Sequence, residues 1–296
     1  MGHREAMNRS HIVVKAPGRV CLFGEHLDYL GLFVISAAID LYITISGSRG
    51  KNRILHILLP DIGEEEWIDL DQPIEYRKRR DYLRSAVKVL HRHGVHFDHG
   101  CDCTLTGTIP IQAGVSSSSA LVIAWITFLL LLENCPEVND RALIAKLGYE
   151  AEVREFDEPG GMMDHFTSSL GGVLWIDCKT PFSVEAIHGS PLQGFVLGDS
   201  LEKKPTTQVL ASVKDDLQNG AQMLRQYLPS FDFRASALRE VEPHLHNLPP
   251  LIQRQLRATL IDRDLALNAK KLLQSQPEDF DSQLGSLLKH HHEQLR

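Results

Sequence analysis

The chain has 296 residues, 43% hydrophobic and 23% charged, so it is long enough to bury one large core or two ordinary ones. This composition excludes a mainly disordered chain, and 21 glycines with 14 prolines exclude a collagen-like or low-complexity protein. Lys and Arg number 31 against 38 Asp and Glu, a net charge of -7 that disfavours a nucleic-acid partner. An anionic ligand therefore needs a local binding site.

Neither a membrane span nor an export signal is expected. The longest apolar run, residues 120–132, is interrupted by Trp125 and Thr127 and is too short to cross a bilayer. The charged start of the chain is not followed by the apolar stretch of a secretory signal. We therefore expect a cytoplasmic protein with no membrane partner.

Cysteine and histidine do not predict a metal site. The five cysteines are odd in number and have no Cys-x-x-Cys spacing, so reduced, mostly buried thiols are expected rather than disulfides or zinc. The 15 histidines include groups at residues 91–99 and 290–292, but neither group has a metal-ligand spacing. We interpret these groups as solvated or structural.

The first half of the chain predicts strands followed by helices. Residues 12–60 contain five short β-rich segments separated by turn signals. Apolar residues recur at helical spacing over residues 77–93, and the Arg-Lys-Arg-Arg start of that stretch is typical of a solvated helix end. An alternating strand follows at residues 101–110, and residues 116–133 predict an apolar helix that begins with serines after Gly114.

The second half is predicted to be mainly helical. A helix over residues 139–156 ends before a Pro-Gly-Gly break. The composition shifts near residue 180, which predicts an α+β domain over residues 1–180, a helix-rich domain over residues 181–296, and a cleft between them. The remaining predicted elements are strands at 171–176 and 195–197 and helices at 207–227, 235–246, 252–274 and 282–295.

The first chemical signal is GTIPIQAGVSSSSAL, residues 107–121. Glycines at the end of a strand let several amides face one point, and the start of the following helix adds unpaired N–H groups. The segment lacks the Walker lysine and the dinucleotide glycine spacing. It predicts a phosphate cradle whose serine hydroxyls could bind magnesium or phosphate, or else a serine-rich cap on a buried helix.

The second signal is KAPGRVCLFGEHLDY, residues 15–29, in which Arg19, Glu25, His26 and Asp28 crowd a short segment between strands. Carboxylates and an imidazole exchange hydrogen bonds with hydroxyl groups, so the cluster suits a polyhydroxylated ligand. A solvated turn is the alternative interpretation.

The third signal is EVREFDEPGGMMDHF, residues 152–166. A carboxylate at a helix end, Glu152, and Asp164 after a Gly-Gly break could converge on one cleft. The aspartate is a candidate base for a hydroxyl or a metal ligand, or a helix cap.

In order and in wording, the three segments resemble the GHMP superfamily of small-molecule kinases, and its galactokinase branch most closely. APGRV, GEH and DY stand at residues 16–20, 24–26 and 28–29. The mevalonate kinase branch lacks the DY pair and usually has lysine where Arg19 stands. The resemblance is good over residues 12–200. It implies a two-domain α+β GHMP kinase fold whose C-terminal domain is helix-rich and ferredoxin-like.

The resemblance also implies roles. Asp164 would take the proton of the sugar's C1 hydroxyl, and Arg19 would keep Asp164 ionised and stabilise the transferring phosphoryl group. Glu152 would hold Mg2+ together with Ser118, or with Ser117 as the second choice. The ATP phosphates would bind at Gly114, Val115, Ser116, Ser117, Ser118 and Ser119, and the sugar at Arg19, Glu25, His26, Asp28, Gly161 and Asp164. The implied reaction is ATP-dependent phosphorylation of galactose or a related sugar at carbon 1.

Departures from the family keep alternatives open. Galactokinases usually have Asn, Thr, Asn and Gln where Cys21, Leu27, Leu30 and His165 stand. The segment after Asp199 also lacks the family's arginine-rich, tyrosine-containing stretch. Another sugar or small molecule is therefore open as the substrate. A galactokinase-like protein that binds sugar and ATP without turnover, or an inactive fragment, is a further alternative.

The end of the chain departs most from the family. Residues 284–296, LGSLLKHHHEQLR, resemble the helix that precedes the family's third, glycine-rich motif, and no segment supplies that motif. We therefore expect either a chain whose C-terminal domain is truncated relative to the family or a natural variant whose ATP site is less enclosed. The sheet edge left open would suit a second copy of the chain, giving a homo-oligomer.

Overall fold

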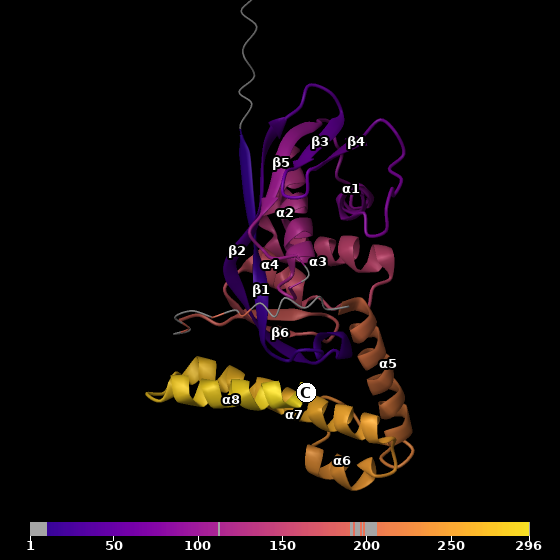
Figure 1. The fold of residues 1–296 in the computed structure, drawn as a ribbon, viewed down its shortest axis with the longest axis vertical. Coiled ribbons are helices and arrows are strands. Elements are labelled where there is room, and N and C mark those ends of the chain that lie inside the picture. Colours follow the sequence, from indigo (N-terminus) through magenta and orange to yellow (C-terminus); the bar gives the residue numbers. More distant parts are fainter. Residues whose placement is uncertain are drawn as a thin grey trace, which may run out of the picture.

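The computed structural model describes residues 11–111, 113–189, 192, 196, 198 and 206–295. Its strands form one mixed, seven-stranded sheet in the order β4-β3-β5-β2-β6-β7, with β1 paired to β2 beside this path (Figure 1). The α+β class predicted from the sequence is confirmed. The strands are β1 (Ile12–Phe23), β2 (Phe33–Arg49), β3 (Ile54–Leu59), β4 (Glu64–Asp69), β5 (Cys101–Gly107), β6 (Val173–Asp177) and β7 (Ser183–Ala186).

Strand β2 organises the sheet. Its first half pairs with β6, its second half pairs with β5, and β1 runs antiparallel along most of its length. Four predicted segments are therefore two long strands, because the chain passes through Gly18 and Asp40 without turning. The pairing shifts register between Pro17 and Arg19, where residues 39–41 of β2 bulge.

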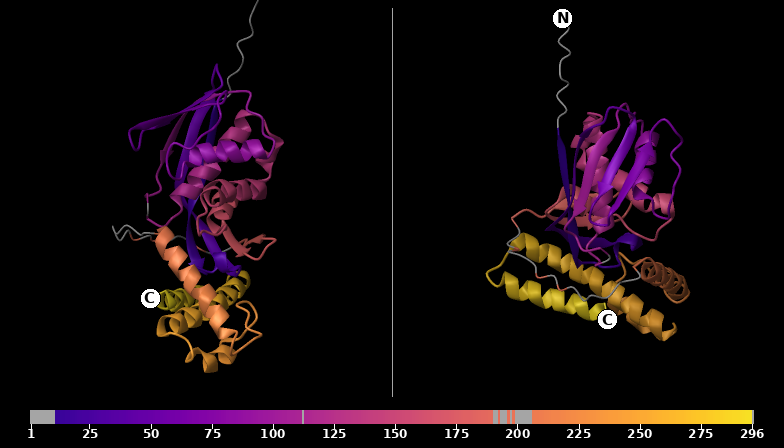
Figure 2. Two further views of the ribbon diagram at one scale, coloured as in Figure 1. Left: turned by 90° about the vertical axis from the view of Figure 1, so that its right-hand side faces the viewer. Right: turned by 45° about the horizontal axis from the view of Figure 1, so that its top comes forward.

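Four helices cover one face of the sheet (Figure 2). They are α1 (Tyr82–Arg92), α2 (Ser117–Leu132), α3 (Arg141–Glu152) and α4 (Met163–Leu170). Helix α2 is apolar on every side, and twelve of its sixteen residues are buried, as expected of a helix enclosed by others. Packing of this helix against the sheet fixes the position of the serine loop at its N-terminus.

The remaining helices lie at the far end of the sheet, at the bottom of Figure 1. They are α5 (Thr206–Leu224), α6 (Leu238–Leu245), α7 (Pro250–Ser275) and α8 (Phe280–Gln294). Leu22, Phe23 and Ile35 of the sheet share a core with Ala266 and Leu273 of α7. Because the two halves share this core, the division at residue 180 stays a prediction. Strand β7 was not predicted, and residues 195 and 197 of the expected strand lie outside the described residues.

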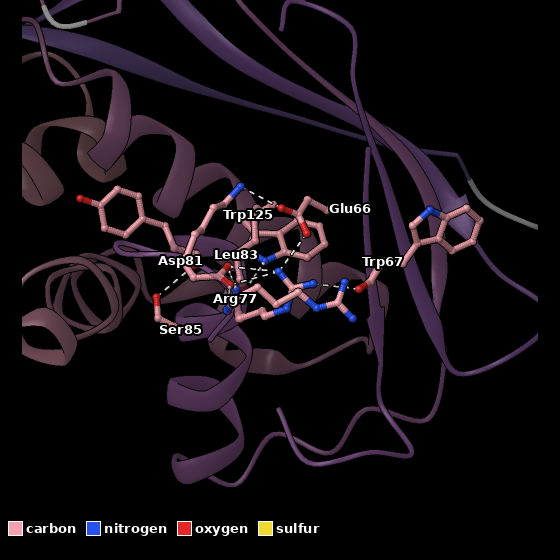
Figure 3. Close-up of polar contacts among 10 residues, drawn as sticks. Glu66, Trp67, Arg77, Asp81, Leu83, Ser85 and Trp125 are labelled. Atoms are coloured by element: carbon pink, nitrogen blue, oxygen red, sulfur yellow. Dashed lines mark hydrogen bonds and ion pairs between the residues drawn. The ribbon is translucent and has the colours of Figure 1, made fainter. Parts of the chain in front are cut away.

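A buried ionic cluster fixes the start of α1 (Figure 3). Asp81 is fully buried and accepts hydrogen bonds from the Arg77 and Arg84 amides, at 3.0 and 3.4 Å. The Arg84 guanidinium, 2% exposed, contacts both Asp81 and Glu66 and donates to the Trp67 carbonyl at 2.9 Å. Helix α1 is thereby joined to strand β4.

Two further expectations can be compared with the structure. All five cysteines are free, and three of them are buried, as predicted. No helix within the described ranges is long and apolar enough to cross a membrane.

Candidate active site

The three sequence signals meet at one cavity of about 330 Å³. It lies where the loop after β1, the loop before α2 and the segment between α3 and α4 come together. Of the predicted site residues, only Val115 does not line it. The predicted residues that do are Arg19, Glu25, His26, Asp28, Gly114, Ser116, Ser117, Ser118, Ser119, Glu152, Gly161 and Asp164.

An ion pair between Arg19 and Asp164 lies at the centre of the cavity. Arg19 Nε and Nη2 donate to the two carboxylate oxygens of Asp164 at 2.7 and 2.9 Å. Burial alone would raise the pKa of Asp164, but the adjacent guanidinium outweighs burial and holds this pKa below its usual range. Asp164 is therefore an ionised, hydrogen-bond-accepting group at neutral pH.

The same arginine fixes the serine loop. Arg19 Nη1 donates to the carbonyl of Gly114 at 2.7 Å, and the Arg19 amide donates to the carbonyl of Val115 at 3.2 Å. Val115 thus holds the loop by its backbone, whereas the sequence predicted that it lines the phosphate site. Gly114 and Ser116 have positive φ values of 78° and 62°, which turn the chain sharply into α2. The free amides of this helix start can bind anions.

The loop from Glu25 to Asp28 forms a second wall. Its entry requires left-handed backbone at Gly24 (φ 91°) and His26 (φ 67°). The Asp28 carboxylate accepts a hydrogen bond from the Tyr29 amide at 2.9 Å. Burial, together with the charges of Asp164 and Glu25, raises the pKa of Asp28 to about 7. The pKa values of Asp28 and Asp164 are thus shifted in opposite directions within one cavity.

Gly161 lies directly against Asp28. A Cβ atom at position 161 would lie 2.0 Å from Asp28 Oδ2, far closer than any side chain tolerates. The glycine therefore allows the loop before α4 to approach the carboxylate. This contact explains the second glycine of the Gly-Gly pair that precedes Asp164 in the sequence.

Glu152 at the end of α3 lies in the cavity wall as predicted. Its Oε2 atom contacts His165 Nε2 at 2.8 Å, and both side chains are buried. No group of three or more His, Cys, Asp or Glu in metal-binding geometry occurs in the described part of the chain. Mg2+ often takes only one or two protein carboxylates and completes its shell with phosphate oxygens and water. Glu152 and the serines of the loop line the same cavity, and a carboxylate with hydroxyl groups is a donor set that such a cation accepts.

Arg80 was not predicted as a site residue. The basic run before α1 was interpreted as a solvated helix end, but Arg80 lines the cavity and forms an ion pair with Glu158. Arg80 has a positive φ of 60° and lies two residues before the start of α1. Four consecutive basic residues in an acidic chain were the available signal. Tyr29, Tyr82 and His165 also line the cavity without having been predicted.

Solved structures with a similar fold are known. The chain matches "Crystal Structure of Lactococcus lactis Galactokinase Complexed with Galactose" with a TM-score of 0.75 at 20% identity, over 97% of this chain and 75% of that one. It matches the mevalonate kinase of Methanococcus jannaschii with a TM-score of 0.64 at 20% identity, over 97% and 78% of the two chains. The profile "GHMP kinases N terminal domain" matches residues 81–172. The predicted GHMP kinase fold is confirmed.

Sequence relatives identify the branch. The galactokinase galactose-binding signature matches residues 1–49. The galactokinase of Pasteurella multocida (strain Pm70) is 32% identical over 300 residues, which are 96% of this chain and 74% of that protein. The galactokinase of Actinobacillus succinogenes is 28% identical with the same coverage. The chain belongs to the galactokinase family, which is one branch of the GHMP kinases. Members of this family use ATP to phosphorylate a sugar.

Proposed function

We propose that this chain transfers the γ-phosphoryl group of ATP to the C1 hydroxyl of galactose. The observation that carries the proposal is the two-point ion pair of Arg19 with Asp164, placed between the serine loop and the Glu25–Asp28 wall. One side of this pair offers amides and hydroxyls to phosphates, and the other offers carboxylates to sugar hydroxyls. The pair lies where the two substrates would meet.

Asp164 and Arg19 are the proposed catalytic residues. The ionised carboxylate of Asp164 accepts a hydrogen bond from the sugar's C1 hydroxyl and takes its proton as the new O–P bond forms. The bond between the γ-phosphorus and the β,γ-bridging oxygen breaks, and ADP leaves. Arg19 offsets the charge that spreads over the transferring phosphoryl group. Such transfer depends mainly on positioning, so a weak base is sufficient.

Substrate binding is divided between the two walls. The amides of residues 114–119 and their serine hydroxyls bind the ATP phosphates. Glu25, His26 and Asp28 bind sugar hydroxyls, and Gly161 brings its backbone to the same ligand. Glu152 and Ser118 would hold Mg2+, which neutralises phosphate charge when it is bound.

Release of ADP over a panel of sugars tests the proposal. We expect release with galactose that exceeds release with glucose, arabinose, N-acetylgalactosamine and galacturonate. Chelation of Mg2+ should abolish it. Binding of galactose and ATP by calorimetry without ADP release from any sugar would contradict the proposal and favour the non-catalytic alternative. Faster turnover of another sugar would instead show that this other sugar is the preferred substrate.

A further inference from the structure

A second cavity, of about 520 Å³, adjoins the first. Asp28, Tyr29, Gly160 and Gly161 line both cavities. Because the Asp28 carboxylate touches the backbone of Gly161, these two residues form a wall between them. The second cavity therefore borders the sugar side of the proposed active site without being part of the phosphate cradle.

Basic side chains converge on this second cavity from three parts of the fold. Lys179 follows β6, Lys214 belongs to α5, Arg225 directly follows α5, and Arg234 lies in the loop before α6. The carboxylates that line the cavity are those of Asp28 and Asp232. In a chain with a net charge of -7, this gathering of four cations in a hollow is a local reversal of charge.

The cations differ in how they are held. Arg234 is fixed, since it donates to both oxygens of Asp177 at 2.8 and 2.7 Å and lies 4.3 Å above the ring of Phe33. Arg225 is oriented by a bond from its Nε to the carbonyl of Phe231 at 3.2 Å. A carbonyl partner leaves its positive charge unneutralised.

Among the described residues, neither lysine of the cavity, Lys179 or Lys214, has a carboxylate at ion-pair distance, although Lys179 is close enough to Asp177 to help lower the pKa of that carboxyl. The Asp232 carboxylate accepts hydrogen bonds from the amides of Arg234 and Ala235 at 2.7 and 3.1 Å and keeps its negative charge, so it offsets only part of the positive charge of the four cations. The cavity therefore presents an excess of positive charge with one guanidinium and two ammonium groups available to a ligand.

We propose that this cavity binds the phosphate group of a small phosphorylated metabolite. A guanidinium together with ammonium groups suits a dianion with several acceptor oxygens better than a single carboxylate. The volume accommodates a phosphorylated compound of sugar size. Since Asp28 forms the shared wall, a bound dianion disfavours the ionised form of this carboxylate and weakens binding of the sugar on the other side. This second consequence rests on the proposed function.

Calorimetric titration with inorganic phosphate, in the absence of ATP and sugar, tests the site. The double variant Lys214→Met/Arg225→Gln should bind phosphate at least tenfold more weakly than the parent. Lys271→Met, which removes an exposed lysine of α7 outside the cavity, should bind as the parent does. ADP should bind equally to all three proteins, and thermal unfolding checks that each is folded. The single variant Lys214→Met provides the same comparison with a smaller change.

Three results would overturn the proposal. They are equal phosphate affinity in the parent and the double variant, no phosphate binding by the parent, and acetate binding as tightly as phosphate. Equal affinity would mean that phosphate binds only at the serine loop. In the kinase assay with saturating ATP, phosphate should raise the galactose KM of the parent but not of the double variant. Because the titration needs no turnover, an inactive chain would refute the proposed function without deciding this one.

Discussion

The pKa values of Asp28 and Asp164 are shifted in opposite directions, although the two side chains line the same cavity. The guanidinium of Arg19 holds the pKa of Asp164 low, whereas burial and neighbouring carboxylates raise the pKa of Asp28 to about 7. Active sites commonly separate the charge states of paired carboxyl groups in this way. In the proposed reaction this separation suits Asp164 to accept the proton, and it predicts that sugar binding depends on pH through Asp28.

A pH profile of the galactose KM checks the role of Asp28. Above pH 7 the ionised carboxylate accepts hydrogen bonds from sugar hydroxyls more strongly than the neutral acid does. The KM should therefore fall by about tenfold as the pH rises from 6 to 8, since the ionised fraction of a group with a pKa of about 7 rises from about one tenth to about nine tenths over that range. Asp28→Asn should remove this dependence. The same pH step in Asp28→Asn would show that another group causes it.

Adjacent glycines provide a matched test of the loop before α4. Gly161→Ala places a Cβ atom 2.0 Å from Asp28 Oδ2, whereas the nearest atom to a Cβ at Gly160 is 3.4 Å away. We expect Gly161→Ala to raise the galactose KM by about tenfold or more, while Gly160→Ala stays within about twofold of the parent. Steady-state kinetics measures both. Equal effects of the two variants would contradict the assigned contact.

The sequence could predict the site residues that lie in three short segments. Arg19, Glu25, His26 and Asp28 occur within ten positions, so their type and spacing carry the information locally. The basic run at residues 77–80 was the only local signal for Arg80, and its place in the cavity could not be predicted because its partner Glu158 is 78 positions away. Only the packing of α1 against the end of α3 brings these two side chains together.

At the scale of elements, helices were easier to predict than strand limits. The apolar periodicity of residues 77–93 and 116–133 located α1 and α2 to within a few residues. Strands β1 and β2 were divided in the prediction, since Gly18 and Asp40 resemble turn residues. In the structure these residues lie at a bulge within the paired strands. The sequence pattern alone does not reveal this pairing.

The cluster at the start of α1 should contribute strongly to stability. Asp81→Ala removes a helix cap and leaves the buried guanidinium of Arg84 without one of its carboxylates (Figure 3). We expect the free energy of unfolding to fall by about 3 kcal/mol, as when other buried pairs are broken. Asp102→Ala, in a side chain that is 74% exposed, should change it by less than about 1 kcal/mol. Urea unfolding measures both, and similar losses would contradict the structure.

At the scale of the whole molecule, the last helix is joined to the active-site loop. His291 of α8 is buried, and its Nε2 accepts a hydrogen bond from the Gly24 amide at 3.1 Å. The imidazole ring also packs edge-on against the ring of Phe23, with 5.5 Å between the two ring centres. Gly24 and His291 are 267 positions apart, so the run of histidines in the sequence could not predict their contact. The C-terminal helices thus support the entry to the Glu25–Asp28 loop.

This contact predicts loss of stability in acid. Burial lowers the pKa of His291 to about 4, so the folded protein keeps it neutral while the unfolded chain takes up a proton below pH 6.5. Stability is complete above pH 6.5 and falls by about 1.4 kcal/mol for each pH unit down to 4. His291→Gln should weaken this part of the pH dependence in urea unfolding. The exposed neighbour variant, His290→Gln, should leave it unchanged, and identical behaviour of both variants would refute the assignment.

Phosphorus NMR of the reaction with ATP, Mg2+ and galactose tests the central claim most directly. The parent and Asp157→Asn, an exposed neighbour outside the cavity, should form a sugar 1-phosphate at similar rates. Asp164→Asn should form it about 1000-fold more slowly, as expected when a positioned base is lost. An unchanged rate in Asp164→Asn, or no sugar phosphate from the parent, would contradict the account.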